Sequence, residues 1–276
     1  MKFLKILKEN IVYIVILLVA IIVFNVKLPY YVMAPGGVIE LNDRVVTEDN
    51  ATLNGSINML YVSEYDGTIA SLFMASIIKG WDISKLEEKQ VSHESVSDIH
   101  KRNEIMRNNS LQNAIYVAYT KAGKEISIKA HKNIILATTL NNNLQIGDII
   151  MEVDDKPLDS ITTLKSIINE KENGDTITLK ILRDSKEMKV TTKIFEEDNQ
   201  KVIGIVAVTN YEYELEHKID IKFKSSETGS SGGLMLALSI YDAISDEDLL
   251  KGRTIAGTGT IDIDGRSEER RVGKEC

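Results

Sequence analysis

The sequence predicts an α+β protein, because strand-like and helix-like patterns occur in separate blocks instead of alternating regularly. Residues 56–65 alternate apolar and polar side chains as a half-buried strand does, whereas Glu94 to Ala122 carries apolar residues at broadly helical spacing. Between Glu125 and Ile194, short strands and one helix follow each other around tight turns. The 276 residues are enough for two modest domains beside a terminal helix.

An apolar segment from Asn10 to Val26 is predicted to be a single transmembrane helix, since its length is near the lower limit for crossing the hydrocarbon core. Three lysines precede the segment, and Lys27 follows it closely. The positive-inside rule then places residues 1–9 in the cytoplasm and the body of the protein outside a bacterial cell membrane. The alternative is a cleaved signal peptide, but no small-residue cleavage site follows the segment promptly.

Residues 27–122 are predicted to form an extracellular region of strands and helices. The segment Ala34–Gly37 contains a proline and two glycines and interrupts regular structure. A helix is expected from Thr68 to Ile78, after the strand at residues 56–65. The longer helix from Glu94 is expected to end at Gly123, since glycine commonly follows the last turn of a helix.

Residues 123–196 are predicted to form a second unit, in which Gly147 and Asp148 make a tight turn before a strand. This segment resembles a PDZ domain, whose core "G-D-x-I-x-x-V-(N/D)-x-x-x-(L/V)" is matched by Gly147, Asp148, Ile150, Val153, Asp154 and Leu158. The resemblance implies a groove in which an extended peptide adds a strand to a sheet edge. No carboxylate-binding loop is recognisable. The alternative is a small α+β domain without a ligand.

The composition excludes other classes of partner. The net charge of −8 and the pI of about 5.2, without clustered basic residues, argue against nucleic acid. The single cysteine is Cys276, so no internal disulfide or cysteine-ligated metal site is expected. The histidines lack the i, i+4 spacing of a metal site, and no metal or cofactor is predicted; they are His93, His100, His131 and His217.

A glycine-rich turn after residue 228 is the candidate catalytic site. It consists of Gly229, Ser230, Ser231, Gly232 and Gly233 and precedes an apolar helical segment. Main-chain N–H groups at the start of such a helix can stabilise an oxyanion next to a serine nucleophile. The alternative is an ordinary turn with a serine as helix N-cap. The turn also fits the nucleophile elbow of α/β-hydrolases, but that fold places its histidine after the serine, and every histidine here precedes Ser231.

Residues 200–265 resemble the proteolytic domain of Lon-type peptidases, in particular the membrane-anchored PDZ–Lon serine proteases. Matches include Gly229, Ser231 and Gly233, the helix residues "L-M-x-x-L-x-I-Y-D" and the strand "I-A-G-T-G-T-I"; Ser230 and Gly232 replace the proline and alanine of the family. The resemblance implies that Ser231 is the nucleophile of a Ser–Lys dyad. It further implies that the protein is an endopeptidase of peptides or exported proteins. No ATPase motif occurs, so ATP-independent proteolysis is expected.

The catalytic lysine implied by the resemblance is expected in a segment after the strand "I-A-G-T-G-T-I", and this chain has no such segment. Residues 266–276 coincide with the translation of a short-read sequencing adapter, so they are interpreted as foreign. The Lon-type domain is therefore predicted to be truncated and the fragment inactive. The rival hypothesis is a membrane-tethered PDZ peptide-binding module without catalysis.

Overall fold

A computed structural model of the chain describes residues 8, 10–47, 54–90, 94–139, 142–224 and 226–267. The chain divides into two compact units, one formed by Met1–Gly37 with Tyr61–Gln90 and the other by Val38–Leu60 with Val91–Cys276. Strands β1 (Lys27–Glu40) and β3 (Ser56–Thr68) contribute residues to both units. Each unit is described separately below.

The first unit contains α2 (Ile11–Asn25), α3 (Ile69–Ile77), β4 (Asp82–Lys85) and α4 (Leu86–Lys89). Strand β4 pairs antiparallel with β1, so that Tyr31 and Val32 of β1 are buried. Helix α3 begins where Thr68 Oγ1 accepts the Ser71 N–H and Ser71 Oγ accepts the Thr68 N–H. This helix confirms the expectation of a helical segment between Thr68 and Ile78.

The prediction of a transmembrane helix over Asn10 to Val26 is wrong. Helix α2 has 15 residues and ends at Asn25, because Val26 is extended and leads directly into β1. A helix of that length rises only about 22 Å, against roughly 30 Å of hydrocarbon core. Among the described residues, no helix is both long and apolar enough to cross a membrane. The expected membrane localisation and extracellular body lose their support with this helix.

One of the two hydrophobic cores of the second unit lies around α5 (Val96–Ala122) and α7 (Gly233–Ile244). Helix α5 starts with a capping box between Ser95 and Asp98 and ends at Gly123, whose φ is +67°, as the sequence predicts. Two short pairs of strands border this core. Strand β13 (Ile219–Ile221) pairs with β2 (Val45–Thr47), and β14 (Thr254–Gly257) pairs parallel with Ser56–Met59 of β3. The expected strand "I-A-G-T-G-T-I" is shorter than predicted, since β14 ends at Gly257.

A second core of this unit lies against a sheet of order β12-β5-β6-β8-β9, with β7 paired to β6. Its strands are β5 (Ile126–Thr138), β6 (Ile149–Val153), β7 (Lys156–Pro157), β8 (Thr176–Arg183), β9 (Lys186–Lys193) and β12 (Ile205–Leu215). Helix α6 (Ile161–Glu170) buries Leu164 and Ile168 in this core. The charged segment after Ile194 forms a hairpin of β10 (Phe195–Glu197) and β11 (Gln200–Val202).

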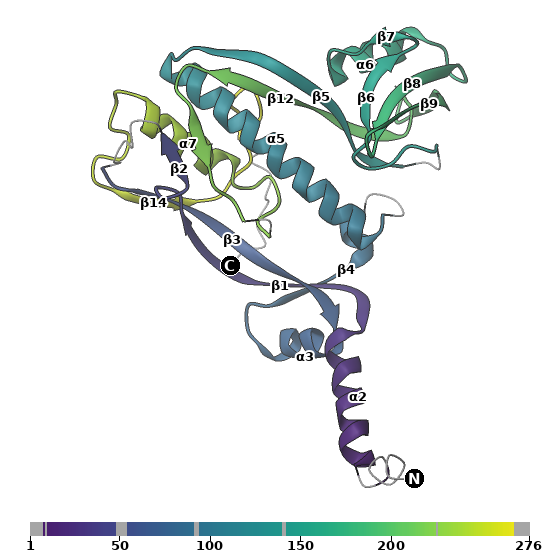
Figure 1. Ribbon diagram of the computed structural model, residues 1–276, viewed down its shortest axis with the longest axis vertical. Coiled ribbons are helices and arrows are strands. Elements are labelled where there is room, and N and C mark those ends of the chain that lie inside the picture. The colour runs from purple at the N-terminus through teal and green to yellow at the C-terminus, as the bar shows by residue number, and fades with distance from the viewer. Residues whose placement is uncertain are drawn as a thin grey trace. The chain divides into compact units, whose positions relative to one another are not determined.

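Strands β5 and β12 are longer than the other strands of the sheet and continue alongside α5 (Figure 1). In the continuation, Tyr213 of β12 stacks on Tyr116 of α5, with ring centroids 5.5 Å apart. The same two strands thus belong to the sheet at one end and cover α5 at the other.

Candidate functional site

The predicted core residues Gly147 and Asp148 stabilise the turn that leads into β6. Gly147 has a φ of +87°, and its N–H donates to Ile135 O (2.8 Å). Asp148 is almost fully buried, accepts the Gln145 N–H (2.8 Å) and binds Arg183 through two hydrogen bonds of 2.7 and 2.6 Å. Hydrogen bonding to Asp148 raises the pKa of Arg183, although partial burial of the guanidinium acts in the opposite direction.

The other predicted core residues are also structural. Ile150 and Val153 are buried in the core beneath the sheet. Asp154 has a φ of +46° in the turn between β6 and β7, and its Oδ1 accepts the Thr178 N–H (2.9 Å). Burial tends to raise the pKa of Asp154, but the hydrogen bond from Lys171 and that from Thr178 together lower it. These residues build the sheet and leave its edge as the place for a ligand.

Strands β12 and β9 are the two edges of the sheet, and β12, which pairs with β5 on one side, has its free edge on the other. The N–H of Ile135 donates to Asp148 O, and its C=O accepts from Gly147, so both groups face β6. Backbone groups of successive residues point to opposite sides of a strand, so Asn133 faces β6 as well. The residues of β12 opposite these two, Ala207 and Thr209, therefore direct their N–H and C=O groups away from β5.

Ile205 also presents its backbone at the free edge. Gly204, with a φ of +70°, accepts the Thr139 N–H (2.9 Å) and so faces β5, which turns the next residue outward. A β-bulge in the pairing with β5 follows between Val206 and Ala207 and preserves the outward direction of Ala207. Ile205 and Ala207 therefore form the open part of this edge.

Apolar side chains of α6 and β12 accompany the free edge, because both elements pack against the same core. The side chains of Ile161 and Ile167 on α6 and of Ile205 on β12 are partly buried against this core and partly accessible. Thr209 Oγ1 accepts the Ile161 N–H (2.9 Å), which holds the first turn of α6 to β12. At the other end of α6, Lys201 Nζ donates to Asn169 O (2.9 Å).

Sequence reasoning missed the free edge because it ended the PDZ segment at residue 196, before β12. It assigned residues 200–265, and β12 with them, to the following domain. The glycine between Ile203 and Ile205 was an available signal, since a glycine inside an apolar strand often marks a bulge or a close backbone approach.

Comparison with known protein families finds one match, to the PDZ domain, over residues 133–194. The chain therefore contains a PDZ domain, the class of domain that typically binds peptides. Solved structures that resemble the chain include the PDZ domains of SdrC-like proteins from Listeria monocytogenes and Listeria innocua. The first is 20% identical, covers 30% of this chain and 93% of its own and has a TM-score of 0.28; the second is 23% identical, covers 28% and 92% and scores 0.26.

A protein of Geobacillus thermodenitrificans solved in solution is 24% identical, covers 27% of this chain and 95% of its own, and has a TM-score of 0.25. A comparison with curated proteins finds no match. These similarities concern the fold, and the Lon-type resemblance of residues 200–265 has no counterpart among them.

The predicted catalytic turn, Gly229–Gly233, lies directly before α7 and is held by its carbonyl groups. Ser231 O accepts the N–H of Gly259 (2.6 Å) and the hydroxyl of Thr258 (2.8 Å). Ser230 O accepts the hydroxyl of Ser110 of α5 (2.9 Å). Among the described residues, no hydrogen bond engages the Ser231 hydroxyl or the N–H groups of Ser231 and Gly232.

The glycines of this turn have different structural roles. The N–H of Gly229 donates to Asn103 O of α5 (3.1 Å), and the φ of Gly229 is +94°. A side chain at Gly232 would collide with the Met59 sulfur, and one at Gly233 with the Ser110 hydroxyl. The turn is therefore packed closely against α5 and β3.

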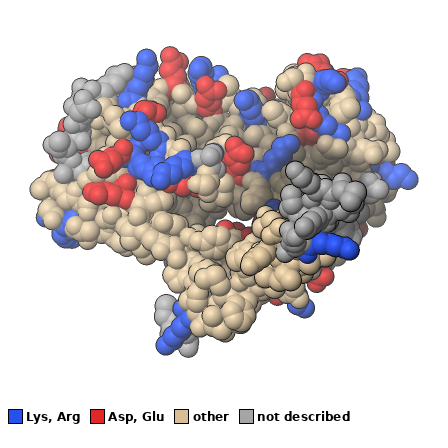
Figure 2. Space-filling model, turned by 60° about the horizontal axis from the view of Figure 1, so that its bottom comes forward, with Lys and Arg blue, Asp and Glu red and all other residues tan. Residues whose placement is uncertain are grey.

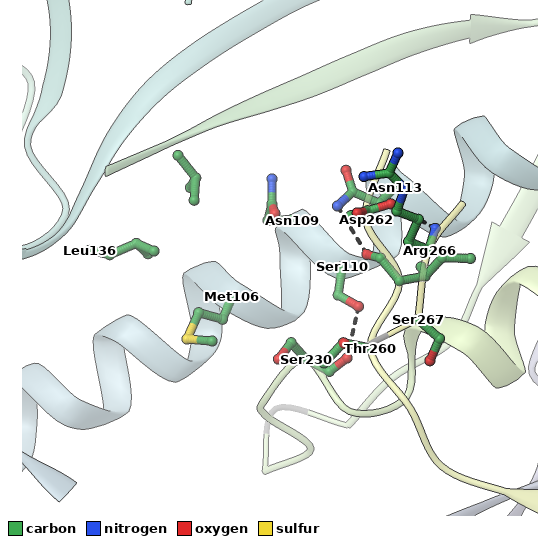
Figure 3. Close-up of a pocket in the computed structure, with 12 residues that line it drawn as sticks. Met106, Asn109, Ser110, Asn113, Leu136, Ser230, Thr260, Asp262, Arg266 and Ser267 are labelled. Atoms are coloured by element: carbon green, nitrogen blue, oxygen red, sulfur yellow. Dashed lines mark hydrogen bonds between the residues drawn. The ribbon is translucent and has the colours of Figure 1, made fainter. Parts of the chain in front are cut away.

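A pocket of about 430 Å³ lies beside this turn (Figure 3). Met106, Asn109 and Ser110 of α5 face it, together with Ser230 and with Val208 of β12. Arg266 and Ser267 also border it, but the sequence predicts that they belong to the foreign segment. Ser231, the predicted nucleophile, does not line this pocket, whereas Ser230 does.

Metal ions and nucleic acids need other groupings of side chains. Within the described part of the chain, no group of three or more histidine, cysteine, aspartate or glutamate side chains could hold a metal ion. On the face shown in Figure 2, acidic and basic side chains are interspersed and no continuous basic patch is present. That face therefore offers no electrostatic match to a nucleic-acid backbone.

Proposed function

We propose that this chain binds extended peptide segments by adding them as a further strand to the free edge of β12. The observation that supports it is the outward direction of the N–H and C=O groups of Ile205 and Ala207. A peptide strand can satisfy these groups through its main chain, whatever its sequence. The half-buried side chains of Ile161, Ile167 and Ile205 gain further burial if the peptide is apolar. The preferred partner is therefore an apolar, extended segment.

The test uses a proline substitution that removes one outward N–H without breaking the pairing with β5. We expect Ala207→Pro to weaken the binding of a fluorescein-labelled peptide by about tenfold or more, because a main-chain hydrogen bond is lost and the proline ring occupies the edge. The peptide is first selected on the chain from a displayed library of dodecapeptides, and its affinity is measured by fluorescence anisotropy.

Thr191→Pro is the matched control. Thr191 lies on β9, at the opposite edge of the same sheet. The N–H of Ile194 donates to Asp175 O, so the backbone of Ile194 faces β8. Because successive residues alternate, the backbone groups of Lys193 and Thr191 face outward. We expect this variant to bind the selected peptide with unchanged affinity. Binding that survives Ala207→Pro, or that fails equally in both variants, would contradict the proposal.

A second function, peptide-bond hydrolysis at Ser231, is supported by the free N–H groups at the start of α7. The partial positive charge of a helix N-terminus adds to these donors and favours an oxyanion beside the Ser231 hydroxyl. In such a reaction Ser231 Oγ attacks the scissile carbonyl while a base accepts the hydroxyl proton. The base implied by the Lon-type resemblance is a lysine after Gly265, outside residues 1–265.

The peptidase proposal is tested in a chain that continues past Gly265 with the lysine-bearing segment of the Lon type. Ser231→Ala should lower casein hydrolysis by about 10⁴-fold or more, because the covalent nucleophile is removed. Ser230→Ala is the neighbouring control and should retain most of the activity, since it is the Ser230 carbonyl and not its hydroxyl that binds Ser110. An indispensable Ser230 with a dispensable Ser231 is the result that would reverse this assignment.

A further inference from the structure

The free edge of β12 is not open along its whole length. The carbonyl group of Thr209 faces outward, but it already accepts a hydrogen bond from Asn109 Nδ2 of α5 (3.2 Å). The side-chain hydroxyl of Thr209 forms two further hydrogen bonds: it donates to Asn133 Oδ1 (2.9 Å) and accepts the Ile161 N–H. Thr209 is therefore a junction that joins β12, β5, α6 and α5.

We infer that Asn109 ends the peptide-binding edge at Thr209 and so limits the length of peptide strand that this PDZ domain can hold. The inference rests on the proposed binding of peptides at this edge. Among the described residues of β12 between Gly204 and Thr209, Ile205 and Ala207 keep outward N–H and C=O groups free, and a strand that pairs with both needs about four residues. Beyond that length the peptide reaches Thr209, whose carbonyl group already accepts a hydrogen bond from the Asn109 side-chain amide, as it would from the N–H of a paired strand.

The end of the peptide that reaches Val208 lies next to the pocket beside the Ser230 turn. Val208 borders the pocket that also contains Met106, Asn109, Ser110 and Ser230 (Figure 3). Polar side chains such as Asn109, Ser230 and Asp262 border that pocket, so it can offer hydrogen bonds to a polar residue of the peptide, whereas the Asn113 amide already donates to Ile261 O (3.2 Å). The geometry therefore directs one end of the bound peptide toward the turn that carries Ser230.

Residue Asn113 provides the matched control for Asn109. Both are asparagines on α5 that border the pocket, and each donates a side-chain hydrogen bond to a carbonyl group. The acceptor of Asn113, however, is Ile261 O, which is remote from β12 in the sequence and is not part of the free edge. A general effect of losing an asparagine from α5 should therefore appear in both variants.

The test compares the full peptide selected from the dodecapeptide library with versions shortened from either end, on the whole chain. In the native chain, residues outside a core of about four should change the affinity by less than about twofold. Asn109→Ala should free the Thr209 carbonyl and tighten the binding of the full peptide by about three- to tenfold, with no gain for the shortened core. Asn113→Ala should leave both affinities unchanged.

A second measurement locates the two ends of the peptide. A photo-crosslinking residue placed at one end should label residues 106–113 or 229–233, while the same residue at the other end should label the region of Gly204 and the last turn of α6. Labelling of neither α5 nor the Ser230 turn by either end would overturn the inference even if the chain carrying Asn109→Ala failed to fold.

The outcomes separate the inference from the function on which it rests. If no selected peptide is sensitive to Ala207→Pro, the proposed function fails and this inference fails with it. If binding is sensitive to Ala207→Pro but shows the same length dependence in the native chain and in Asn109→Ala, the peptide still binds the edge and the inference alone is wrong.

Discussion

Three tight turns in and next to the PDZ domain contain non-glycine residues in the left-handed backbone conformation. Both central residues have positive φ at Asp154–Asp155, Asp184–Ser185 and Asp198–Asn199, as two-residue hairpin turns require. Aspartate and asparagine tolerate this conformation, because their short polar side chains form local hydrogen bonds. Serine is the least suited of these residues, so Ser185 carries an avoidable conformational cost.

Replacing Ser185 by glycine is expected to stabilise the PDZ domain by about 0.5–1 kcal/mol. Its φ of +64° is unfavourable with a Cβ, and glycine adopts it without steric cost, although glycine also gains freedom in the unfolded chain. The midpoint of urea unfolding should rise. As a control, Ser166→Gly in the exposed face of α6 should lower the free energy of unfolding by about 0.5 kcal/mol and so lower the midpoint, because glycine is a poor helix former. A lower midpoint for Ser185→Gly would indicate that this turn is not strained.

At the scale of single elements, the sequence predicts what depends on local signals. The capping residues Ser95 and Gly123 define both ends of α5, and the turns at Gly147 and Asp154 define both ends of β6. What it could not predict is strand pairing over long distances. Strand β12 begins after Gly204, yet its partner β5 begins at Ile126. Nothing local in either strand identifies the other, because register depends on the whole sheet.

The N-terminal helix illustrates a different limit. Its composition is apolar throughout, and composition alone does not specify where a helix ends. The helix ends at Asn25, because the following residues are extended and pair in a sheet. The candidate site shows the same contrast, since Ser231 was placed by its turn motif, whereas the contacts of Asn109 with Thr209 depend on packing between α5 and β12.

The second unit as a whole contains two hydrophobic cores joined by the long strands β5 and β12. One core includes Ile240 of α7 and the facing residues of α5, and the other includes Ile181 of β8 and the buried face of α6. No buried residue belongs to both cores. The proposed peptide-binding edge of β12 therefore lies on one of the two strands that connect the cores.

The separation of the cores predicts that they open independently. Ile181 and Ile240 are both fully buried, one in each core, so truncating either leaves a cavity. Ile181→Ala should destabilise the PDZ core by about 2–5 kcal/mol. Amide hydrogen exchange followed by mass spectrometry should then become faster in β6, β8 and β9 and remain unchanged in α5 and α7. Ile240→Ala should give the reverse pattern, and Thr176→Ala, at an exposed position of β8, should change neither. If Ile181→Ala accelerates exchange equally in α5, α7 and the sheet, the two cores open as one cooperative unit and β5 and β12 transmit the loss from one to the other.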